Sequence, residues 1–335
     1  MALQADGVLE VKKRESIWKS SALQRILAFA ALIVLIVVFS VASPNFLQFR
    51  NITGILLATA VNGILALGVT FVIISGGIDL SIGTVMTFSA VMTGVFITNW
   101  GLPIPIGVIG GILAGSLAGF MNGFIITKMK VPPFVATLGM MYVAKGLALI
   151  IAELRPIYFN DAEGFSDIAT GSILGSLIPG FTIPNAVVIM FVAAIIASFV
   201  LFKTLLGRYN FAIGSNEEAT RLSGVTVDRW KTAVYTVSGT FAGLAGVVIA
   251  SRLNSAQPAL GQGYELDAIA AVVIGGTSLS GGDGSILGTI IGAFVISVLT
   301  NGLRILSVPQ EWQIVVTGAI IVVAVYFDMM RRRSQ

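Results

Sequence analysis

Few side chains in this 335-residue sequence could do chemistry, and most of those that could are carboxylates beside long apolar segments. Asp79, Glu265 and Asp267 lie close to the ends of such segments. A carboxylate there is most often interfacial, but Asp79 belongs to the run Gly76-Gly-Ile-Asp-Leu-Ser81. Glycines beside a polar cluster are typical of a membrane helix interrupted where it lines a cavity. We therefore expect Asp79, Ser81, Glu265 and Asp267 to border a route for a polar solute.

Lys145 differs from these carboxylates because it lies inside an apolar segment. It stands about 14 residues from the start of that segment, roughly 20 Å along a helix. An ammonium group in hydrocarbon is costly unless it has a partner or water. Lys145 is therefore either part of the same route or a structural residue that snorkels or pairs.

The longest polar stretch after the N-terminus runs from Gly207 to Lys231, and it contains a short helix with recognisable ends. Ser215 and Glu218 have the spacing of a capping box. Glu217 and Glu218 would lie at the positive end of the helix dipole, Arg221 near its negative end, and Gly224 just after it. A helix this short needs a surface on which to dock. The segment is either a solvated loop or an element that couples the chain to a cytosolic partner.

Common enzyme chemistry is missing from the sequence. The chain has no histidine and no cysteine, which excludes disulfides, the usual zinc sites and imidazole acid–base catalysis. No glycine is followed directly by lysine, so the chain has no phosphate-binding loop of the Walker A type. We expect neither an enzyme nor a resident metal or cofactor.

Composition indicates a polytopic membrane protein. Hydrophobic residues make up 56% of the chain and charged residues only 11%, where about 25% is usual for soluble domains. The mean hydropathy is +0.95. The net charge of +4 lies largely in loops, so it indicates orientation in the membrane and not binding to nucleic acid.

The sequence predicts an all-α fold with ten transmembrane helices, each near the roughly 20 residues that a bilayer requires. Residues 1–22 form an N-terminal segment, 23–328 a single transmembrane domain and 329–335 a tail, with 152–184 as a large external loop and 207–231 as the coupling loop. The short segment 266–280 is a candidate for a broken or re-entrant helix. The expected spans are 23–42, 52–75, 80–99, 104–127, 131–151, 185–206, 232–251, 266–280, 285–303 and 312–328.

Basic residues predict the orientation. Ten crossings place both termini on one side, and fifteen of the 20 lysines and arginines fall on that side. The positive-inside rule then places both termini and the coupling loop in the cytosol. The fifteen are residues 12, 13, 14, 19, 25, 128, 130, 203, 208, 221, 229, 231, 331, 332 and 333, whereas 50, 155, 252 and 304 face outward and Lys145 lies inside a span.

Two stretches of the sequence resemble one another, which predicts an internal repeat. Asn122-Gly123 is followed by Val131-Pro132, and Asn301-Gly302 is followed by Val308-Pro309. Glycines at four-residue spacing stand before or around each pair, where helix backbones can approach closely. Spans 2–5 and 7–10 begin on opposite sides of the membrane, so we expect an inverted repeat of the kind found in transporters. The glycines are 107, 111, 115, 119 and 123, and 284, 288 and 292.

Nearly the whole chain resembles the permease subunits of bacterial ABC importers for monosaccharides, most closely the ribose permeases. The resemblance is carried by short motifs spread over the sequence. They are Ser43-Pro-Asn-Phe46, Gly77-Ile-Asp-Leu-Ser81, Leu206-Gly-Arg-Tyr209, Gly214-Ser-Asn-Glu-Glu-Ala219, Arg221-Leu-Ser-Gly-Val225, Ser255-Ala-Gln-Pro258, Gly263-Tyr-Glu-Leu-Asp267 through Val273, Ile274-Gly-Gly-Thr-Ser278 and Gly281-Gly282. At Asp283 the chain departs from the basic residue common in ribose permeases, so ribose itself is less firmly indicated than the class.

The resemblance implies a multi-pass protein of the bacterial inner membrane that works as a dimer, with a second permease subunit that is an identical copy. It also implies two cytosolic ATPase subunits and an extracytoplasmic sugar-binding protein. The coupling loop would then contact the ATPase through residues Gly214, Ser215, Asn216, Glu217, Glu218, Ala219, Arg221 and Gly224.

Arg50 and Arg304 follow spans in short external loops and are expected to pair with carboxylates of the binding protein, or else to anchor span ends at lipid headgroups. A permease for branched-chain amino acids is the nearest alternative function. An ion-coupled secondary transporter fits less well, because a single lysine with no carboxylate at the membrane centre makes a poor ion relay.

Overall fold

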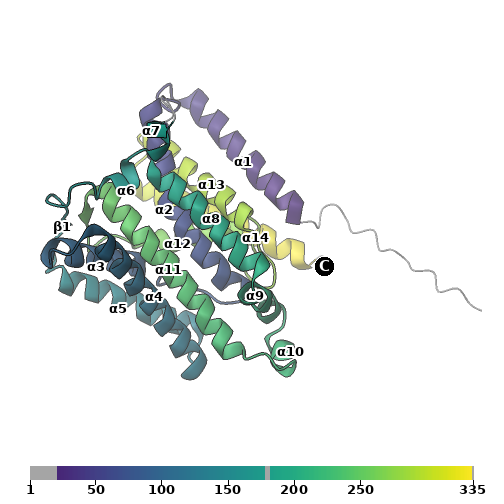
Figure 1. Ribbon diagram of the computed structural model, residues 1–335. Helices are drawn as coiled ribbons and strands as arrows, with labels where there is room; N and C mark the ends of the chain where they lie inside the picture. Colours follow the sequence, from purple (N-terminus) through teal and green to yellow (C-terminus); the bar gives the residue numbers. More distant parts are fainter. Residues whose placement is uncertain (1–20, 178–181, 334–335) are drawn as a thin grey trace, which may run out of the picture.

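The computed structural model describes residues 21–177 and 182–333, and these form a bundle of long helices (Figure 1). Lys12, Lys13, Arg14 and Lys19 of the predicted N-terminal segment therefore lie outside the described residues, as do residues 178–181 of the external loop and 334–335 of the tail. The elements are α1 Ser21–Ala42, α2 Phe49–Ile74, α3 Ile82–Gly94, the π-helical segment η2 Val95–Asn99, α4 Ile104–Lys128, α5 Pro133–Ile151, β1 Ile157–Tyr158, α6 Asp167–Thr170, α7 Ile173–Leu177, α8 Asn185–Lys203, α9 Leu205–Ser215, α10 Glu217–Leu222, α11 Val227–Leu253, β2 Ser255–Ala256, α12 Tyr264–Ile274, α13 Ile286–Ile305 and α14 Gln310–Arg333.

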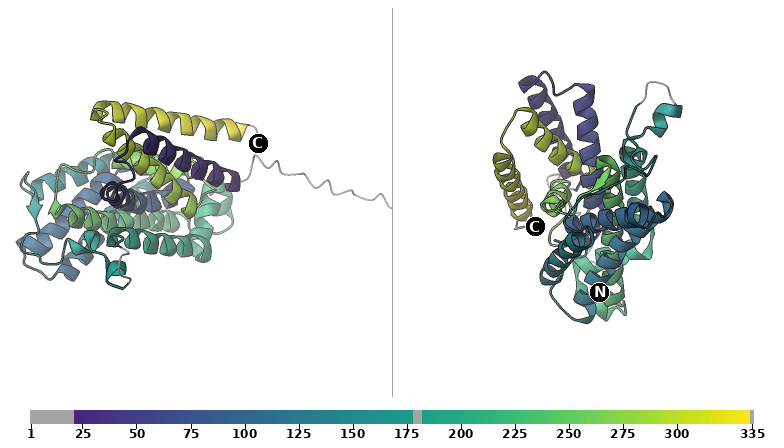
Figure 2. Two further views of the ribbon diagram at one scale, coloured as in Figure 1. Left: turned by 90° about the horizontal axis from the view of Figure 1, so that it is seen from above. Right: turned by 90° about the vertical axis from the view of Figure 1, so that its left-hand side faces the viewer.

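Different elements lie at the two ends of the bundle. One end carries α9 and α10, together with the first turn of α1 and the last turn of α14; we call it the α10 end (Figure 1). The opposite end carries α6, α7 and the short antiparallel pair β1–β2; we call it the β1 end. The described ends of the chain thus lie at the same end of the molecule, as an even number of crossings requires. Views from two other directions separate α1 and α14 from α4 and α5, on opposite sides of the bundle (Figure 2).

The all-α polytopic fold is confirmed. Among the described residues, eight helices are long and apolar enough to cross a bilayer: α1, α2, α3 continued by η2, α4, α5, α8, α11 and α13. The predicted span 312–328 falls within α14, which begins earlier and runs on through most of the predicted tail. The coupling loop 207–231 is more helical than predicted, because its first residues belong to α9 and its last to α11.

The predicted span 266–280 is not a full membrane helix. It corresponds to α12, which has 11 residues, about 16 Å of helix, and ends at Gly275 and Gly276. An irregular segment, 257–263, enters the bundle before it and completes the distance between the two ends. α12 is therefore a half-helix, in agreement with the expectation of a broken or re-entrant segment.

The contacts between helices follow the predicted inverted repeat. If α2 to α5 correspond to α11 to α14, each packing pair has a counterpart: α4 with α11 matches α13 with α2, and α3 with α4 matches α12 with α13. α3 with α11 likewise matches α12 with α2. The two halves are thus interleaved, because α4 packs against α11 and α13 against α2, each across the boundary between the halves.

Glycine explains the closest of these contacts. Gly115 and Gly119 of α4 face Gly239 and Gly243 of α11 so closely that an added Cβ at Gly119 would meet the Tyr235 carbonyl and the Gly239 backbone. Nearer the start of α4, Gly107 and Gly111 of the same four-residue series instead receive side chains of η2 and α3. The four-residue spacing therefore serves two neighbours, α11 and α3, along one face of α4.

This packing makes Gly119 intolerant of even a methyl group. We expect Gly119→Ala to lower the stability of the purified permease by roughly 1–3 kcal/mol, since neither backbone can yield easily. The midpoint of thermal unfolding in detergent measures it. Gly139→Ala on α5 is the matched control, because no atom lies within 4 Å of its added Cβ. Equal midpoints for the two variants would contradict this description of the α4–α11 contact.

Candidate functional site

α10 is the short helix predicted in the coupling loop, and it projects from the α10 end of the bundle (Figure 1). Glu217 and Glu218 occupy its first turn and Arg221 its last, as predicted. Gly224, with φ of +85°, follows the helix and donates its N–H to the Arg221 carbonyl over 3.0 Å. The predicted cap is wrong by one residue. Ser215 closes α9, and it is the Asn216 side chain that accepts the Ala219 N–H, over 2.9 Å.

Asn216 replaces Ser215 as the cap because the chain turns sharply between the two helices. Asn216 alone has extended backbone, φ −160° and ψ 102°, which is the conformation that a capping residue adopts. α9 therefore runs into α10 with a single residue between them. The capping-box pattern indicated a helix here but could not show that another helix would occupy Ser215.

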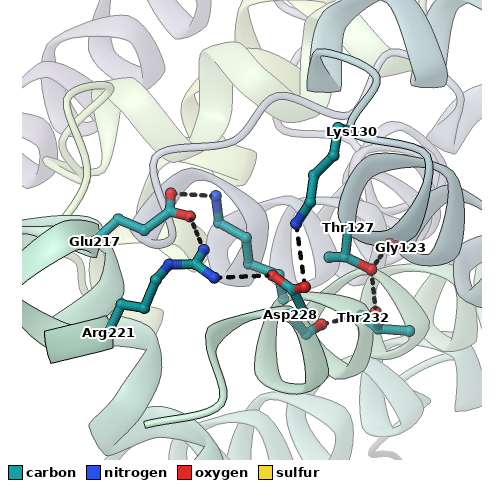
Figure 3. A network of polar contacts seen from close by, with 8 residues as sticks. Gly123, Thr127, Lys130, Glu217, Arg221, Asp228 and Thr232 are labelled. Atoms are coloured by element: carbon teal, nitrogen blue, oxygen red, sulfur yellow. Dashed lines mark hydrogen bonds and ion pairs between the residues drawn. The ribbon is translucent and has the colours of Figure 1, made fainter. Parts of the chain in front are cut away.

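Ion pairs fix α10 against α11, and one more ion pair joins α11 to the connector between α4 and α5 (Figure 3). Glu217 accepts from Lys231 over 2.6 Å and from Arg221 over 3.0 Å. Asp228 accepts from Lys130 over 3.1 Å and lies 3.5 Å from Arg221. Partial burial alone would raise the pKa of Glu217, but Lys231 and then Arg221 hold it below its usual value. Glu217 therefore stabilises this arrangement above the ordinary glutamate pKa and loses that contribution as pH falls through the lowered pKa.

Sequence reasoning missed Lys130, Asp228 and Lys231 as members of this network. Lys130 belongs to a different loop, and only the approach of α4 to α11 brings it near Asp228. Hydroxyl groups support the same approach, since Thr127 of α4 lies 3.0 Å from Thr232 of α11 (Figure 3). The network thus links the position of α10 to the start of α5.

α10 also presents exposed surface. The Leu222 side chain is 83% exposed although it lies at the polar end of the bundle, where no lipid would cover it. Next to it, a pocket of about 380 Å³ is lined by basic and neutral residues: Lys128, Arg221, Val225, Thr226, Val227 and Arg229, with Asp228 the one acid. An exposed leucine beside a cationic pocket is a surface suited to an apolar and acidic partner.

A backbone junction connects α9 with both halves of the repeat. The Ile74 carbonyl, at the end of α2, accepts the Gly282 N–H over 2.9 Å. Gly214 of α9 packs directly on the same carbonyl, where a Cβ would clash. Asn210 of α9 donates to the Phe71 carbonyl over 2.9 Å. The segment before α10 therefore contacts the loop after α2 and the loop after α12 at one point.

Asp79 is buried in the loop between α2 and α3, with 2% of its surface exposed. Its Oδ1 accepts from the backbone N–H and the hydroxyl of Ser81, over 2.9 and 2.6 Å, and its Oδ2 accepts from Ser238 of α11 over 3.0 Å. Asn122 of α4 in turn donates to the Ser81 hydroxyl over 2.8 Å. Asp79 and Ser81 thus hold the interrupted backbone to α4 and α11.

Glu265 plays a similar part at the start of α12. It is 7% exposed, and both its carboxylate oxygens lie 3.1 Å from the Gly263 N–H. Gly83, in the first turn of α3, packs against Glu265 and the Gly261 backbone. Thr87 of α3 donates to the Leu260 carbonyl over 2.8 Å. The two interrupted helices, α3 and α12, therefore begin beside each other inside the bundle.

Lys145 has a specific partner, Gln262, whose Oε1 accepts from its Nζ over 3.0 Å. Gln262 belongs to the irregular segment just before α12, so the structure brings Lys145 next to the start of α12. Asp267 lies elsewhere: it is half-buried in the first turn of α12, two residues after Glu265 and therefore about 200° around the helix from it. Of the five predicted route residues, four therefore surround the starts of α3 and α12, and Asp267 lies on another side of α12.

Arg50 and Arg304 converge on one pocket at the β1 end, although they are far apart in the sequence. The pocket has a volume of about 670 Å³ and is lined by Asn45, Gln48, Arg50, Asn51, Gly54, Arg304 and Ile305. Asn301 donates to the Asn51 side chain over 3.0 Å and so ties the end of α13 to the start of α2. The four ion pairs found among the described residues all lie around α10, so neither arginine is paired there.

The site separates buried carboxylates from exposed polar groups. The described residues contain no group of three or more acidic side chains placed to hold a metal ion. The buried carboxylates accept hydrogen bonds from backbone and hydroxyl groups and so maintain interrupted helices. By contrast, Lys145 and Gln262, on the open side of α5, and the charged surfaces at the two ends of the bundle are at least partly exposed.

Known proteins resemble this chain over most of its length. Residues 51–325 match the family described as branched-chain amino acid transport system / permease component. The chain is 44% identical to the ribose import permease protein RbsC of Bacillus subtilis (strain 168), over 93% of this chain and 94% of that relative. It is 41% identical to the RbsC protein of Escherichia coli (strain K12), over 89% and 91%. It is 34% identical to the xylose transport system permease protein XylH of Haemophilus influenzae, over 94% and 99%. No solved structure matches the chain.

Asn216 is the residue to change in order to test the cap of α10. We expect Asn216→Ala to destabilise α10 by about 1 kcal/mol, because the Ala219 N–H loses its acceptor, and so to speed hydrogen exchange at that amide roughly five-fold. Hydrogen exchange of the intact permease measures this. Asn216→Asp keeps an acceptor and should stay near wild type, as should Ser215→Ala. Faster exchange in Ser215→Ala than in Asn216→Ala would return the cap to Ser215.

Proposed function

The chain belongs to the family of permease components described for branched-chain amino acid transport systems, and from this membership we propose that it is the membrane subunit of an ABC importer that passes a monosaccharide. The sugar class is favoured because the similar permeases carry the names of ribose and xylose systems at 34–44% identity over most of both chains. Ribose or a related sugar is the expected solute. An amino acid permease remains the family's general description and is less favoured for this chain.

The observation that carries the proposal is the joint position of α10. α10 lies exposed at one end of the bundle. Gly214 of α9, just before it, packs on the Ile74 carbonyl at the end of α2, and that carbonyl accepts the N–H of Gly282 in the loop after α12. A displacement of α10 by a partner would therefore reach the loop that leads into α3 and the loop that follows α12. A channel would have no need for such an element, whereas a permease driven by a separate ATPase requires one.

We assign the ATPase contact to the residues around α10. Ala219, Arg221 and Leu222 supply its exposed surface, and Asn216 and Glu217 hold its shape. ATP hydrolysis then belongs to two separate cytosolic subunits, and the α10 end faces the cytosol with both termini. The basic residues of this end, by the positive-inside rule, support that orientation. The full assigned set is Gly214, Ser215, Asn216, Glu217, Glu218, Ala219, Arg221 and Gly224.

We assign the route to the region where α3 and α12 begin. Asp79, Ser81 and Glu265 hold the backbone that borders the route and do not face the solute themselves, because all three are buried and hydrogen-bonded near the starts of α3 and α12. Lys145 faces it more directly, since it is partly exposed. Asp267 would border the route only from the far side of α12. In a dimer with a second, identical copy, two such regions would line one passage.

We assign docking of the extracytoplasmic binding protein to the Arg50–Arg304 pocket. Both guanidinium groups line one pocket, which favours a single carboxylate of the binding protein per permease copy. A two-lobed binding protein would then place one carboxylate on each copy of the dimer. Charges at the rim of an interface mainly affect how fast the partners associate and in which orientation, and salt weakens this attraction by screening the charges.

Ala219→Arg tests the energy coupling. We expect the variant to insert in the membrane but to lose binding-protein-stimulated ATPase activity and sugar uptake, because a guanidinium at this exposed contact would clash and be partly desolvated. Both activities are measured in proteoliposomes that contain the ATPase and are supplied with binding protein. Lys203→Ala, at the same end of the bundle on α8, is the control and should remain active.

Two results would contradict the proposal. Wild-type ATPase stimulation in the assembled Ala219→Arg complex would remove α10 as the contact. Uptake by the wild-type permease alone under an ion gradient, with no ATPase and no binding protein, would replace the ABC mechanism with a secondary transporter.

Arg50→Glu and Arg304→Glu test the docking pocket. Each should weaken the apparent affinity for the binding protein about two- to five-fold at low ionic strength, and less at high salt, because an attractive contact becomes repulsive. The binding-protein concentration that gives half-maximal ATPase stimulation measures this. Arg155→Glu makes the same charge change outside the pocket and should leave the affinity unchanged. If the double variant keeps wild-type stimulation, the two arginines only anchor helix ends at lipid headgroups.

A further inference from the structure

Lys145 and Gln262 form a polar pair on the open side of α5. α5 packs against α3 and α4 and lies at the edge of the bundle, so much of its surface faces away from the protein (Figures 1 and 2). Around Lys145 that surface is otherwise largely apolar, with Tyr142, Val143 and Leu147 between 41% and 66% exposed. Gln262 is itself exposed.

This pair cannot face lipid without cost. An ammonium in the hydrocarbon region is expensive, and an amide whose hydrogen bonds are unmade adds to the expense. Lys145 lies about 18 Å from the start of α5, too far for its side chain to reach headgroups at the α10 end. It lies about 9 Å from the end of α5 at Ile151, but helical side chains tilt toward the helix N-terminus, away from that end, and its Nζ is bonded to Gln262. The side of α5 that carries Lys145 and Gln262 therefore faces water or a polar solute.

The pair retains unused donors. The Lys145 ammonium has three N–H groups and the Gln262 amide two, and within the described residues the only bond between them and a neighbour is Lys145 to Gln262 Oε1. Up to four N–H groups are thus free to bind oxygen atoms of a solute. Tyr142, three residues before Lys145 and on the same helical face, adds a ring and a phenolic hydroxyl.

The backbone holds Gln262 in place. Gly261 and Gly263, on either side of it, have φ of +97° and +95°, which turns the chain tightly at this point. Gly261 is packed against Gly83 of α3, and Leu260 accepts a hydrogen bond from Thr87. Glu265 fixes the Gly263 N–H. Gln262 is therefore presented at the start of α12 by a backbone that is fixed on both sides.

We propose that Gln262, together with Lys145 and with Tyr142 beside it, forms a contact site for the passing monosaccharide. This inference rests on the proposed function, because it names the residues that the sugar meets on its route. A neutral sugar offers hydroxyl and ring oxygens that match the free N–H groups, and the apolar side of its ring matches Tyr142. Hydrogen bonds between neutral partners and a single ammonium also keep binding weak enough for the sugar to leave.

The same chemistry argues against an acidic solute. A carboxylate would pair with Lys145 as an ion pair and displace Gln262 from it. A site for carboxylates would more often use an arginine, with its two-pronged geometry. A neutral polyhydroxylated solute instead uses both members of the pair.

Gln262→Ala and Gln262→Leu test the site in proteoliposomes that contain the ATPase and are supplied with ribose-loaded binding protein. We expect stimulated ATPase activity to stay within about two-fold of wild type, and the ribose imported per ATP hydrolysed to fall at least three-fold. Lys145→Met should lower the ribose imported per ATP hydrolysed to a similar extent. Lys145→Arg should lower it less, because arginine keeps a cationic donor. Gln257→Ala is the matched control, since Gln257 lies in the same segment and bonds to Ser255 instead.

A second measurement uses the absence of cysteine from the chain. Gln262→Cys should react with a small aqueous maleimide, and millimolar ribose, but not equal acetate, should slow the reaction. An unchanged ratio of ribose to ATP in both Gln262 variants would overturn the site, as would slowing by acetate but not by ribose. Failure of the proposed function would look different: wild-type uptake would then not depend on the ATPase and binding protein at all.

Discussion

Every interruption of a helix inside a membrane leaves backbone groups that lipid cannot satisfy, and this constraint explains the centre of the molecule. α3 and α12 both begin within the bundle, and buried side chains complete their hydrogen bonds. Asp79 accepts the Ser81 N–H, Glu265 accepts the Gly263 N–H, and Thr87 donates to the Leu260 carbonyl. These acids are therefore parts of the scaffold first. Their burial also explains why the polar groups left open to a solute are few.

The inverted repeat produces the same helix packing twice, once around α3 and once around α12. Because α4 packs on α11 and α13 on α2, each half supplies the support for the other half's interrupted helix. Glycines make this interleaving possible at the α4–α11 contact. Within the second half, Gly288 and Gly292 of α13 pack closely against Gly275, just after α12, and against Ala271 of α12. α3 and α12 consequently start next to each other, and a single region serves both repeats.

Much of this was predictable from sequence, where local chemistry decides the outcome. Apolar segment length predicted the long helices, and charge and glycine positions predicted α10 to within one residue of its cap. The short length of 266–280 also indicated a broken helix. Pairs that depend on tertiary approach were not predictable: Lys130 with Asp228, Lys145 with Gln262, and Arg50 with Arg304 come from loops far apart in the chain. The position of Gln262 between two glycines could have indicated a functional residue. Its partner Lys145 could not be predicted, because residue spacing does not show which distant side chain an amide will meet.

The junction at the Ile74 carbonyl is made of main-chain atoms, with Gly282 as donor and Gly214 packed on it. A main-chain contact of this kind tolerates substitution at Ile74, which supplies only its carbonyl, but not at the two glycines, where a Cβ would clash. The surfaces on either side of it, the exposed face of α10 and the polar groups near α12, are free to change independently. Under the proposed function, the same contact with the ATPase is therefore compatible with permeases for different sugars, whose solute would be set by the polar groups near α12.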